Sequence, residues 1–320
     1  MRVAIVGYGA IGHVIERALD GRADVLIVDR TKAPLRDGEP PADVAVICVK
    51  THGTTWAAEM AQHVVAREGA AITIQNGLGN WEVLRDAVGE RHAAVGVIYV
   101  GARLDERGEL HATGAGRAEL GRPSGTEHAK RIDELAALLR DGGMTVDVID
   151  DPWPAVWRKV VTNAAVNPTT ALLGYVNAYL LGDRAAGRIA DGLAREVARV
   201  ASAHGVAIAE DDAVRWWRDM AQLTGANRSS MLQDVEAKRP TEVDAICGAV
   251  YREGQRAGVA APLNQSMMIL IAAIAGGLVF FAGAAMPRQM VIRRVAGWLL
   301  VLSGLGIAFL GYAPSVNVSF

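Results

Sequence analysis

Three polar side chains at four-residue spacing stand out in a segment that is otherwise rich in valine and alanine. They are Lys159, Asn163 and Asn167, within the sequence WRKVVTNAAVNP. On a helix, side chains four residues apart share one face, so a cation and two carboxamides would line the same surface. An ammonium can give a proton to a carbonyl oxygen during reduction, while amides hold the substrate. The spacing therefore predicts a site that reduces a keto acid, with electrons supplied by a cofactor.

The start of the chain predicts where that cofactor binds. Residues 3–6 are an apolar run typical of a strand buried on both faces, and a helical segment ending near Asp20 follows a glycine turn. A second strand at 25–28 ends at Asp29. This order is the dinucleotide-binding fingerprint, in which the turn and the helix N-terminus hold a pyrophosphate. The turn consists of Gly7, Tyr8, Gly9, Ala10, Ile11 and Gly12.

Charges at two strand ends bear on which nicotinamide cofactor is used. Asp29 can accept hydrogen bonds from a ribose 2′-hydroxyl, which favours NADH, whereas Arg30 can pair with a 2′-phosphate, which favours NADPH. Lys50, at the end of the apolar run 44–49, adds a second cation near this edge. Each of these cations can also be explained as a solvated surface charge. Taken together they favour NADPH, with NADH as the alternative.

The next strand segments predict a doubly wound sheet. Residues 71–74 run into Gln75-Asn76-Gly77, and ligands bind beyond the carboxyl ends of such strands, so Asn76 is expected to meet the nicotinamide. Asn-Gly is also a common turn pair, which would explain it without a ligand. Segments at 95–100 and 109–120 are expected to extend the sheet, antiparallel at its far side. A helix at 127–140 and a strand at 145–149 follow.

The chain changes character at residues 150–154, where two prolines in three residues can continue neither a strand nor a helix. Beyond them helical periodicity replaces strand signals. We therefore predict an α/β protein with a dinucleotide-binding domain at 1–151 and an all-α domain at 152–266. The first helix would stop or kink near Pro168. Helices at 183–204 and 209–223 follow, with Trp216 and Trp217 as packing anchors.

Two polar residues in the second half have ordinary structural explanations when each is taken alone. Ser230 lies in a polar turn that enters a helix and would cap it. Glu242 would be a first-turn acid stabilised by the helix dipole.

Composition narrows the functional class. The formal net charge of −2, without a basic run, gives no reason to expect nucleic acid as a partner. Cys48 and Cys247 lie far apart in apolar contexts, which indicates reduced core cysteines in a cytoplasmic protein. The seven histidines are scattered without metal-ligand spacing, so no metal is expected. The chain opens directly into a strand, which leaves no room for a signal peptide.

Together these motifs resemble the ketopantoate reductase (2-dehydropantoate 2-reductase) family. The resemblance covers roughly residues 1–265 and includes GYGAIG, QNGLGN, WRKVVTNAAVNPTTA and NRSSMLQDVEAKRPTEVDAICG. It implies an N-terminal Rossmann domain joined to an α-helical domain, with NADPH and a 2-oxo acid substrate between them. Family members occur in more than one oligomeric form, and no interface signal stands out in this chain.

The resemblance also assigns roles to individual residues. It places the catalytic pair on Lys159 and Glu242. It places NADPH contacts on the glycine turn, Arg30, Lys50 and Asn76. Its substrate-binding residues fall on Asn163, Asn167, Asn177, Asn227 and Ser230. The chain departs from the family pattern in a short segment between Arg30 and Asp43, and in Asp29, which replaces a small residue.

The end of the chain is atypical for that family. Residues 267–320 contain no acid and no lysine, and their only charges are Arg288, Arg293 and Arg294. The uncharged stretches 267–285 and 295–312 are each close to the minimum length for crossing a bilayer. A single span at 295–312, with the arginines on the cytoplasmic side, agrees with the positive-inside tendency better than two spans. We therefore predict membrane association through 267–312, with packing onto the protein as the alternative.

The function predicted from the sequence is NADPH-dependent reduction of 2-dehydropantoate to (R)-pantoate, in the pathway to pantothenate and coenzyme A. One alternative is a related reductase that acts on another 2-oxo acid, because no motif encodes the pocket for the alkyl part of the substrate. A second is a membrane-tethered nucleotide-binding module without catalysis, which would need neither Lys159 nor Glu242.

Overall fold

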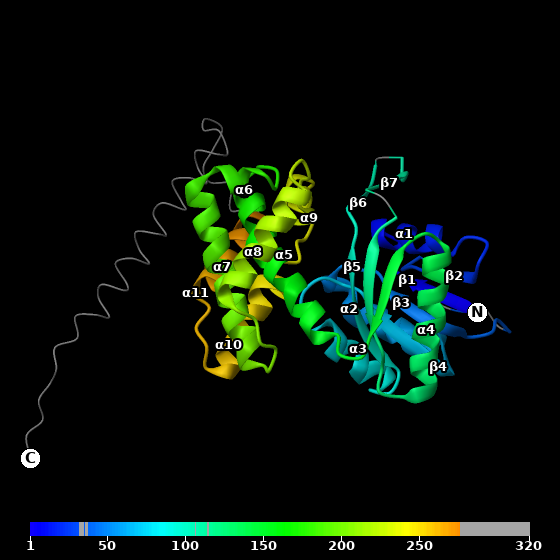
Figure 1. Cartoon of the computed structure of the whole chain (residues 1–320). Coiled ribbons are helices and arrows are strands. Elements are labelled where there is room, and N and C mark those ends of the chain that lie inside the picture. Colours follow the sequence, from blue (N-terminus) through cyan, green and yellow to red (C-terminus); the bar gives the residue numbers. More distant parts are fainter. Residues whose placement is uncertain (32–34, 36–37, 106, 114, 276–320) are drawn as a thin grey trace, which may run out of the picture.

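The computed structural model describes residues 1–31, 35, 38–105, 107–113 and 115–275, which form two halves lying side by side (Figure 1). Within these residues, the N-terminal half is built on a seven-stranded sheet. Its strands are β1 (Arg2–Val6), β2 (Asp24–Val28), β3 (Ala42–Ile47), β4 (Val65–Thr73), β5 (Ala93–Tyr99), β8 (Arg117–Gly121) and β9 (Thr145–Ile149). They lie in the order β2-β1-β3-β4-β5-β8-β9. This doubly wound order brings the carboxyl ends of β1, β3, β4 and β5 to one edge.

Strands β1 to β5 are mutually parallel, whereas β8 is antiparallel to β5, as predicted for the far side of the sheet. The prediction that all of 109–120 extends this sheet is wrong for β7 (Leu110–Ala112), which pairs with β6 (Ala102–Leu104) in a separate hairpin. The Asp105 carboxylate stabilises the hairpin turn by accepting hydrogen bonds from the amides of Arg107 and Glu109, both at 2.9 Å. The chain is thereby folded back before it can reach the main sheet.

Helices cover both faces of the sheet. On one face, α1 (Ala10–Leu19) and α4 (Thr126–Asp141) pack on side chains such as Ile5 and Ile72. On the other face, α2 (Thr54–Val64) and α3 (Asn80–Val88) pack on Val6 and Ile47, and a short 3-10 turn, η1 (Thr51–Gly53), precedes α2. Strands β1, β3 and β5 and the second half of β4 are therefore buried on both faces, which explains their apolar runs, whereas the edge strands β2 and β9 are partly exposed.

The C-terminal half is entirely helical among the described residues. It comprises α5 (Trp153–Leu173), α6 (Tyr179–Gly182), α7 (Arg184–Ala203), α8 (Glu210–Leu223), α9 (Ser230–Glu236), the π-helix η2 (Asp244–Gly248), α10 (Ala249–Ala257) and α11 (Pro262–Ala275). Trp217 is 0% exposed in the centre of this core, which confirms it as a packing anchor. Trp216 packs against the same core from a partly buried position.

The helix that carries Lys159 is longer than predicted. It begins at Trp153, inside the segment predicted as the domain boundary, because Pro154 occupies the first turn, where no backbone N–H is needed. It also continues past Pro168 to Leu173, with Gly174 as its C-cap. Of the two outcomes predicted near Pro168, a stop or a kink, the stop is therefore wrong. Nearly every residue around this proline is buried in the helical core, and that packing outweighs the lost hydrogen bond.

The serine cap of α9 is displaced by one residue from the predicted position. Ser229 is the N-cap, and its hydroxyl accepts from the amide of Leu232 at 3.1 Å. Ser230 is the first helical residue and is exposed to solvent. A capping side chain must precede the helix in an extended conformation, which Ser229 adopts with φ −58° and ψ 155°.

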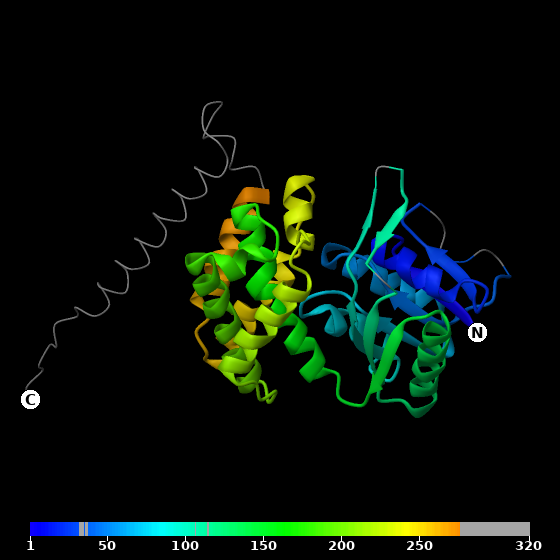
Figure 2. The ribbon, with the colours of Figure 1, turned by 45° about the horizontal axis from the view of Figure 1, so that its top comes forward.

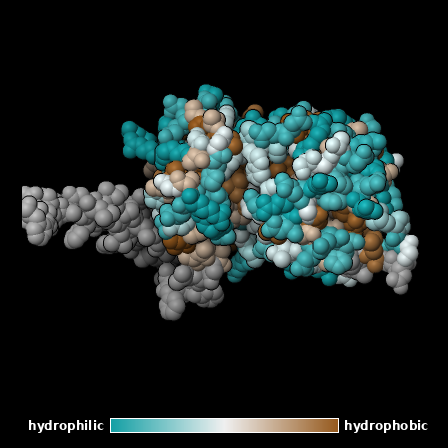
Figure 3. All heavy atoms as spheres, turned by 90° about the horizontal axis from the view of Figure 1, so that it is seen from below, coloured by the Kyte–Doolittle hydropathy of each residue, from teal (hydrophilic) through white to brown (hydrophobic). Residues whose placement is uncertain are grey.

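The predicted membrane segment, 267–312, begins within α11 (Pro262–Ala275). Residues 276–320, which include 295–312 and most of 267–285, lie outside the described residues. Within the described part of the chain, no helix combines the length and apolar character needed to cross a bilayer. Helix α11 runs across the predicted boundary at 266/267 and buries Met267 and Ile271 against the helical core. On the face seen in Figure 3, hydrophobic residues form small patches among hydrophilic ones.

Candidate active site

The residues singled out from the sequence gather mainly where the sheet edge meets the helical half. Helix α5 leads from the end of β9 into the helical half, so one long element lies against both (Figure 2). Its first turns pack on β5, where Val95 and Val97 contact Ala155 and Val156. Lys159 and Asn163 follow directly on this helix, and packing of its start fixes their position relative to the carboxyl ends of the strands.

The glycine turn after β1 fits a pyrophosphate. Gly9 precedes α1, and a Cβ placed on it would meet nothing within 4 Å, so the backbone there is open to a ligand. No side chain caps the N-terminus of this helix, and its first amides therefore remain available to an anion. By contrast, a Cβ on Gly7 would lie 2.4 Å from Val49 Cγ1, and one on Gly12 would lie 2.4 Å from the carbonyl oxygen of Gly7. Gly7 and Gly12 allow tight packing, and Gly9 leaves space.

Side chains of the turn interact with α1. The Tyr8 hydroxyl donates to the Glu16 carboxylate, and the Tyr8 ring stacks on His13 with centroids 3.8 Å apart. Burial, followed by the hydrogen bond to Glu16, raises the pKa of Tyr8 to about 12, so its hydroxyl stays protonated. Ala10 and Ile11 form the first turn of α1.

The end of β2 carries opposite charges side by side. One Asp29 carboxylate oxygen accepts from the amide and the hydroxyl of Thr31, at 2.7 and 2.6 Å. The exposed guanidinium of Arg30 lies 5.6 Å from the centre of the Trp56 ring at the start of α2. Arg30 is thus exposed just after β2, with its guanidinium over an aromatic ring.

Lys50 is directed toward the helical half. Its ammonium forms an ion pair with Asp234 of α9, whose side chain is 2% exposed. Arg239 contacts the other oxygen of Asp234 at 3.1 Å. A buried carboxylate needs such partners to remain charged, and here they come from both halves of the protein. Lys50 therefore links β3 to α9, in addition to any contact with a cofactor.

Asn76 and Glu242 form the centre of the site. The Asn76 amide donates to Glu242 Oε2 at 3.1 Å, and its oxygen accepts from the Asn163 amide at 3.2 Å. The other Glu242 oxygen accepts from the backbone amide of Thr51 at 3.1 Å. Glu242 is 7% exposed, and its burial raises the pKa of the carboxyl, although the hydrogen bonds from Asn76 and Thr51 oppose that shift. Asn76 thus connects a carboxylate of one half to an amide on α5.

The Asn-Gly turn at this point is also a packing device. Gly77 has φ +84°, and a Cβ on it would lie 2.2 Å from the carbonyl oxygen of Ala245 in η2. The next amide, of Leu78, donates to that same carbonyl at 2.9 Å. Only glycine permits this approach, because any side chain would collide with the backbone of η2. The turn is therefore held against the helical half directly beside Asn76.

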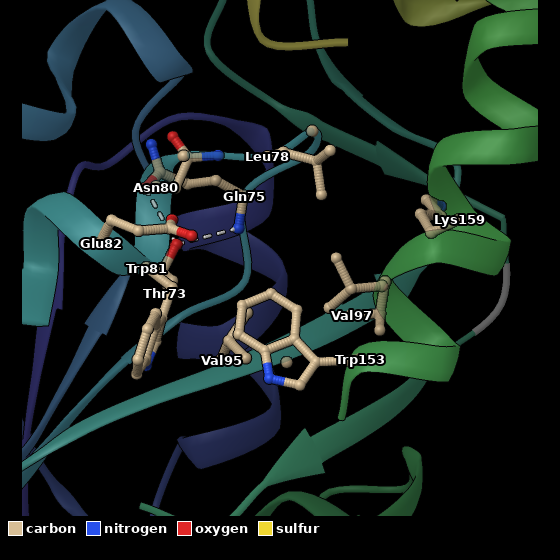
Figure 4. A pocket seen from close by; sticks show the side chains of 14 residues that line it. Thr73, Gln75, Leu78, Asn80, Trp81, Glu82, Val95, Val97, Trp153 and Lys159 are labelled. Atoms are coloured by element: carbon tan, nitrogen blue, oxygen red, sulfur yellow. Dashed lines mark hydrogen bonds between the residues drawn. The ribbon is translucent and has the colours of Figure 1, made fainter. Parts of the chain in front are cut away.

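Lys159 reaches from α5 toward the end of β5. Its ammonium donates to the carbonyl oxygen of Ile98 at 3.1 Å and lies 4.6 Å from the centre of the Tyr99 ring. Burial among apolar neighbours lowers the pKa of Lys159 to about 8. Figure 4 shows this lysine opposite Gln75, Asn80 and Glu82 across a cavity of about 20 Å³.

Lys159 and Glu242 are not ion-paired within the described residues. The link that the structure does show runs from Asn163, four residues along the same helix, through Asn76 to Glu242. Catalytic hydrogen bonds are commonly long or unformed until substrate is bound. The arrangement thus places a proton donor and a carboxylate in one neighbourhood, without direct contact between them.

The remaining predicted substrate residues occupy different settings. Asn167 is buried, and its carbonyl oxygen accepts from the hydroxyl of Thr170 at 3.1 Å. The Asn177 amide donates to Thr224 Oγ1 at 2.9 Å, and the Asn177 backbone amide donates to the carbonyl oxygen of Asn227 at 3.0 Å. Asn177 therefore shapes the loop that carries Asn227.

Asn227 lies close to the other half of the protein. Its amide nitrogen is 3.5 Å from where a Cβ on Gly101 would be, just after β5. Ser230 is exposed and begins α9, three residues after Asn227. Asn227 thus lies beside the segment that follows β5, and Ser230 lies on the helix that comes next in the chain.

Several members of the site carry no signal that we recognised in the sequence. The Thr51 amide acts through its backbone, which no side-chain pattern reveals. Asp234 lies four residues after Ser230 on α9, so the helical spacing of these two polar residues could have indicated Asp234 as a member of the site. Tyr99 ends an apolar run that we interpreted only as a strand.

Among residues described by the structure, no group of three or more His, Cys, Asp or Glu side chains is arranged to hold a metal ion.

Comparisons with known proteins agree with this architecture. Residues 33–125 match the family model for ketopantoate reductase PanE/ApbA, and residues 152–275 match the model for its C-terminal domain. A 2-dehydropantoate 2-reductase of Archaeoglobus fulgidus is 30% identical over 298 residues, spanning 87% of this chain and 99% of that protein. One from Halobacterium salinarum is 32% identical over 300 residues, spanning 85% and 98%.

Solved structures show the same fold. The 2-dehydropantoate 2-reductase from Geobacter metallireducens superposes with a TM-score of 0.73 at 29% identity, covering 85% of this chain and 99% of that one. A D-mandelate dehydrogenase with NADH and anilino(oxo)acetate gives a TM-score of 0.79 at 22% identity, covering 87% and 100%, and this likeness concerns the fold alone. With two family models and full-length relatives in agreement, the chain belongs to the ketopantoate reductase family.

Proposed function

We propose that this protein reduces 2-dehydropantoate to (R)-pantoate with NADPH, in the pathway to pantothenate and coenzyme A. The observation that carries the proposal is the polar line Asn163–Asn76–Glu242 beside Lys159, at the carboxyl ends of β4 and β5. Family membership and relatives named 2-dehydropantoate 2-reductase support the reaction. When bound, the cofactor supplies the hydride that is added to the keto carbon.

Lys159 is proposed as the general acid. Its pKa of about 8 means that the ammonium is largely protonated at neutral pH yet gives up its proton more readily than an ordinary lysine. The proton goes to the keto oxygen as negative charge develops there, and the product is the alcohol. The resting contact with the Ile98 carbonyl is a single hydrogen bond, so the flexible side chain can exchange it for the substrate.

Glu242 is proposed to orient the substrate and the lysine. Two donors, Asn76 and the Thr51 amide, hold its carboxylate in place, so it can accept a hydrogen bond from a substrate hydroxyl at a fixed position. Asn163, Asn167, Asn227 and Ser230 are proposed to bind the carboxylate and hydroxyl of the substrate. The contacts of Asn177 support a role in shaping the Asn227 loop.

The preference for NADPH rests on Arg30. Its guanidinium is exposed at the end of β2 and supported by Trp56, which suits a 2′-phosphate. Asp29 next to it favours NADH instead, but one of its oxygens is already occupied by Thr31. The open backbone at Gly9 and the uncapped start of α1 fit the pyrophosphate of either cofactor.

The proposal is tested by following NADPH and NADH oxidation with 2-dehydropantoate and with a panel of other 2-oxo acids. We expect the highest kcat/KM with 2-dehydropantoate and NADPH. Lys159→Ala should lower kcat about 10²- to 10⁴-fold while NADPH binding, measured by fluorescence, is retained. A variant that turns over at the wild-type rate would remove Lys159 from the mechanism. Higher kcat/KM with another oxo acid would favour a related reductase instead.

A further inference from the structure

The resting place of the Lys159 ammonium is formed by two consecutive residues at the end of β5. Ile98 provides a carbonyl oxygen at 3.1 Å, and Tyr99 provides a ring whose centre lies 4.6 Å away. A cation over an aromatic face is attracted by the negative charge density of the ring, and this attraction strengthens when water is excluded. Neither contact is a carboxylate, and among the residues that the structure describes Lys159 forms no ion pair.

The Tyr99 ring is itself fixed by a buried carboxylate. Its hydroxyl donates to Glu119 Oε2 at 3.0 Å, and Glu119 on β8 is 6% exposed. Arg158, the residue before Lys159, donates to both Glu119 oxygens at 3.0 Å, and Arg117 reaches Oε1 at 3.1 Å. Both oxygens of the Glu119 carboxylate therefore have hydrogen-bond donors, which a buried carboxylate requires.

This network has a direct electrostatic effect on the ring. Burial, together with the nearby charge of Glu119, raises the pKa of Tyr99 to about 12, so the phenol remains a donor. A phenol that donates to a carboxylate is polarised by it, which increases electron density on the ring face. Arg117 also approaches this ring, at 5.9 Å from its centre. Glu82 of α3 also lines the Lys159 cavity, and it is the only further titratable group there among the described residues.

We propose that Tyr99 is a positioning residue that favours the protonated form of Lys159 and fixes where its ammonium rests, and that Glu119, held by Arg158, sets the orientation of the Tyr99 ring. This proposal rests on the function proposed above, in which Lys159 is the proton donor. Arg158 and Lys159 are neighbours on α5. The same turn of this helix therefore carries the proposed proton donor, Lys159, and the arginine that holds Glu119 against Tyr99.

A purely structural role for the network predicts something different. Glu119 joins β8 to α5, and loss of that tie alone would lower stability without changing the protonation of Lys159. The decisive measurement is therefore the pKa of Lys159 itself. It can be obtained from NMR titration of full-length protein labelled with ¹³C at lysine Cε, with the Lys159 signal assigned through a Lys159→Met variant.

Two substitutions at Tyr99 separate the ring from its hydroxyl. Tyr99→Leu removes the aromatic face but keeps an apolar side chain, and we expect the pKa of Lys159 to fall by about 0.5 to 1.5 units. Tyr99→Phe keeps the ring face and should shift this pKa less than Tyr99→Leu does. In Tyr99→Leu the alkaline limb of kcat for reduction should move to lower pH by the same amount, while KM for NADPH stays unchanged.

If the melting temperature shows that Tyr99→Leu is folded and the pKa of Lys159 is unchanged in it, the proposal is overturned. If Tyr99→Leu does not fold, Glu119→Gln provides the second test, because it removes the charge that polarises and orients the ring. The Lys159 pKa should then fall as well, and an unaltered value again refutes the inference. The NMR titration needs no substrate, so it remains decisive even if Lys159→Ala retains activity and the proposed function fails.

Discussion

The amide of Asn76 donates a hydrogen bond to Glu242 at 3.1 Å, across the junction between the α/β half and the helical half. The same carboxamide accepts from Asn163 on α5. One side chain at the end of β4 therefore fixes the relation between the proposed catalytic carboxylate and the helix that carries the proposed acid. The close packing of Gly77 on Ala245 keeps this turn in register with η2.

Substitution of Glu242 should affect catalysis more than folding. Glu242→Gln keeps an oxygen that can accept from Asn76 or Thr51 but removes the negative charge, so we expect kcat/KM for the oxo acid to fall about 10²-fold or more. Asp244→Asn, an exposed acid two residues away that pairs with Arg252, is the matched control and should retain activity. Steady-state kinetics and melting temperatures of the two variants distinguish a loss of catalysis from a loss of stability. Equal activity of Glu242→Gln and wild type would count against the assigned role.

The pH dependence should reflect Lys159. Its pKa is lowered by burial to about 8, and the reduction requires the protonated ammonium. We therefore expect kcat for reduction to be constant near neutrality and to fall about tenfold per pH unit above that pKa. The reverse oxidation requires the neutral amine and should rise through the same range. Initial rates in both directions at saturating substrate provide the measurement, and an alkaline limb near the usual lysine pKa would show that burial does not act as described.

The three glycines of the turn should respond differently to alanine. Gly9→Ala adds a Cβ that meets nothing within 4 Å, so the fold should be kept, but the methyl group enters the space expected for the pyrophosphate. We expect Kd for NADPH to rise about tenfold or more with little change in melting temperature. Gly7→Ala forces a Cβ to 2.4 Å from Val49 Cγ1 at φ +99°, which should destabilise the protein by about 1–3 kcal/mol. A loss of stability in Gly9→Ala equal to that in Gly7→Ala would contradict this division of roles.

Cofactor choice should follow the two charges at the end of β2. Asp29→Asn keeps the oxygen that accepts from Thr31 but removes the charge that would repel a 2′-phosphate, so KM for NADPH should fall relative to KM for NADH. Arg30→Ala should have the opposite effect on this ratio. Asp24→Asn, at the other end of the same strand, serves as the control. If Arg30→Ala leaves the ratio of the two KM values unchanged, Arg30 does not bind the phosphate.

Most of the fold follows from local patterns in the amino-acid sequence. The apolar runs and the glycine turn are local patterns, and each strand of the parallel sheet carries its own signal, so β1 to β5 were predicted, together with α1 and α4. Helices α2 and α3 were not predicted. The family motifs likewise identified the ketopantoate reductase family without coordinates. Local rules failed where tertiary packing overrode them, as at Pro168, which the buried environment of α5 keeps helical.

Contacts between the predicted residues, in contrast, depend on how distant segments pack against one another. Spacing on one helix placed Lys159 beside Asn163, but contacts between Asn76 and Glu242, or between Lys50 and Asp234, join residues 166 and 184 positions apart. Such pairs depend on how the two halves pack, which no local pattern encodes. The same holds for Tyr99, whose position under the ammonium of Lys159 arises from the crossing of α5 over β5. Burial at that crossing, rather than the identity of the lysine, lowers its pKa, because desolvation disfavours the charged form.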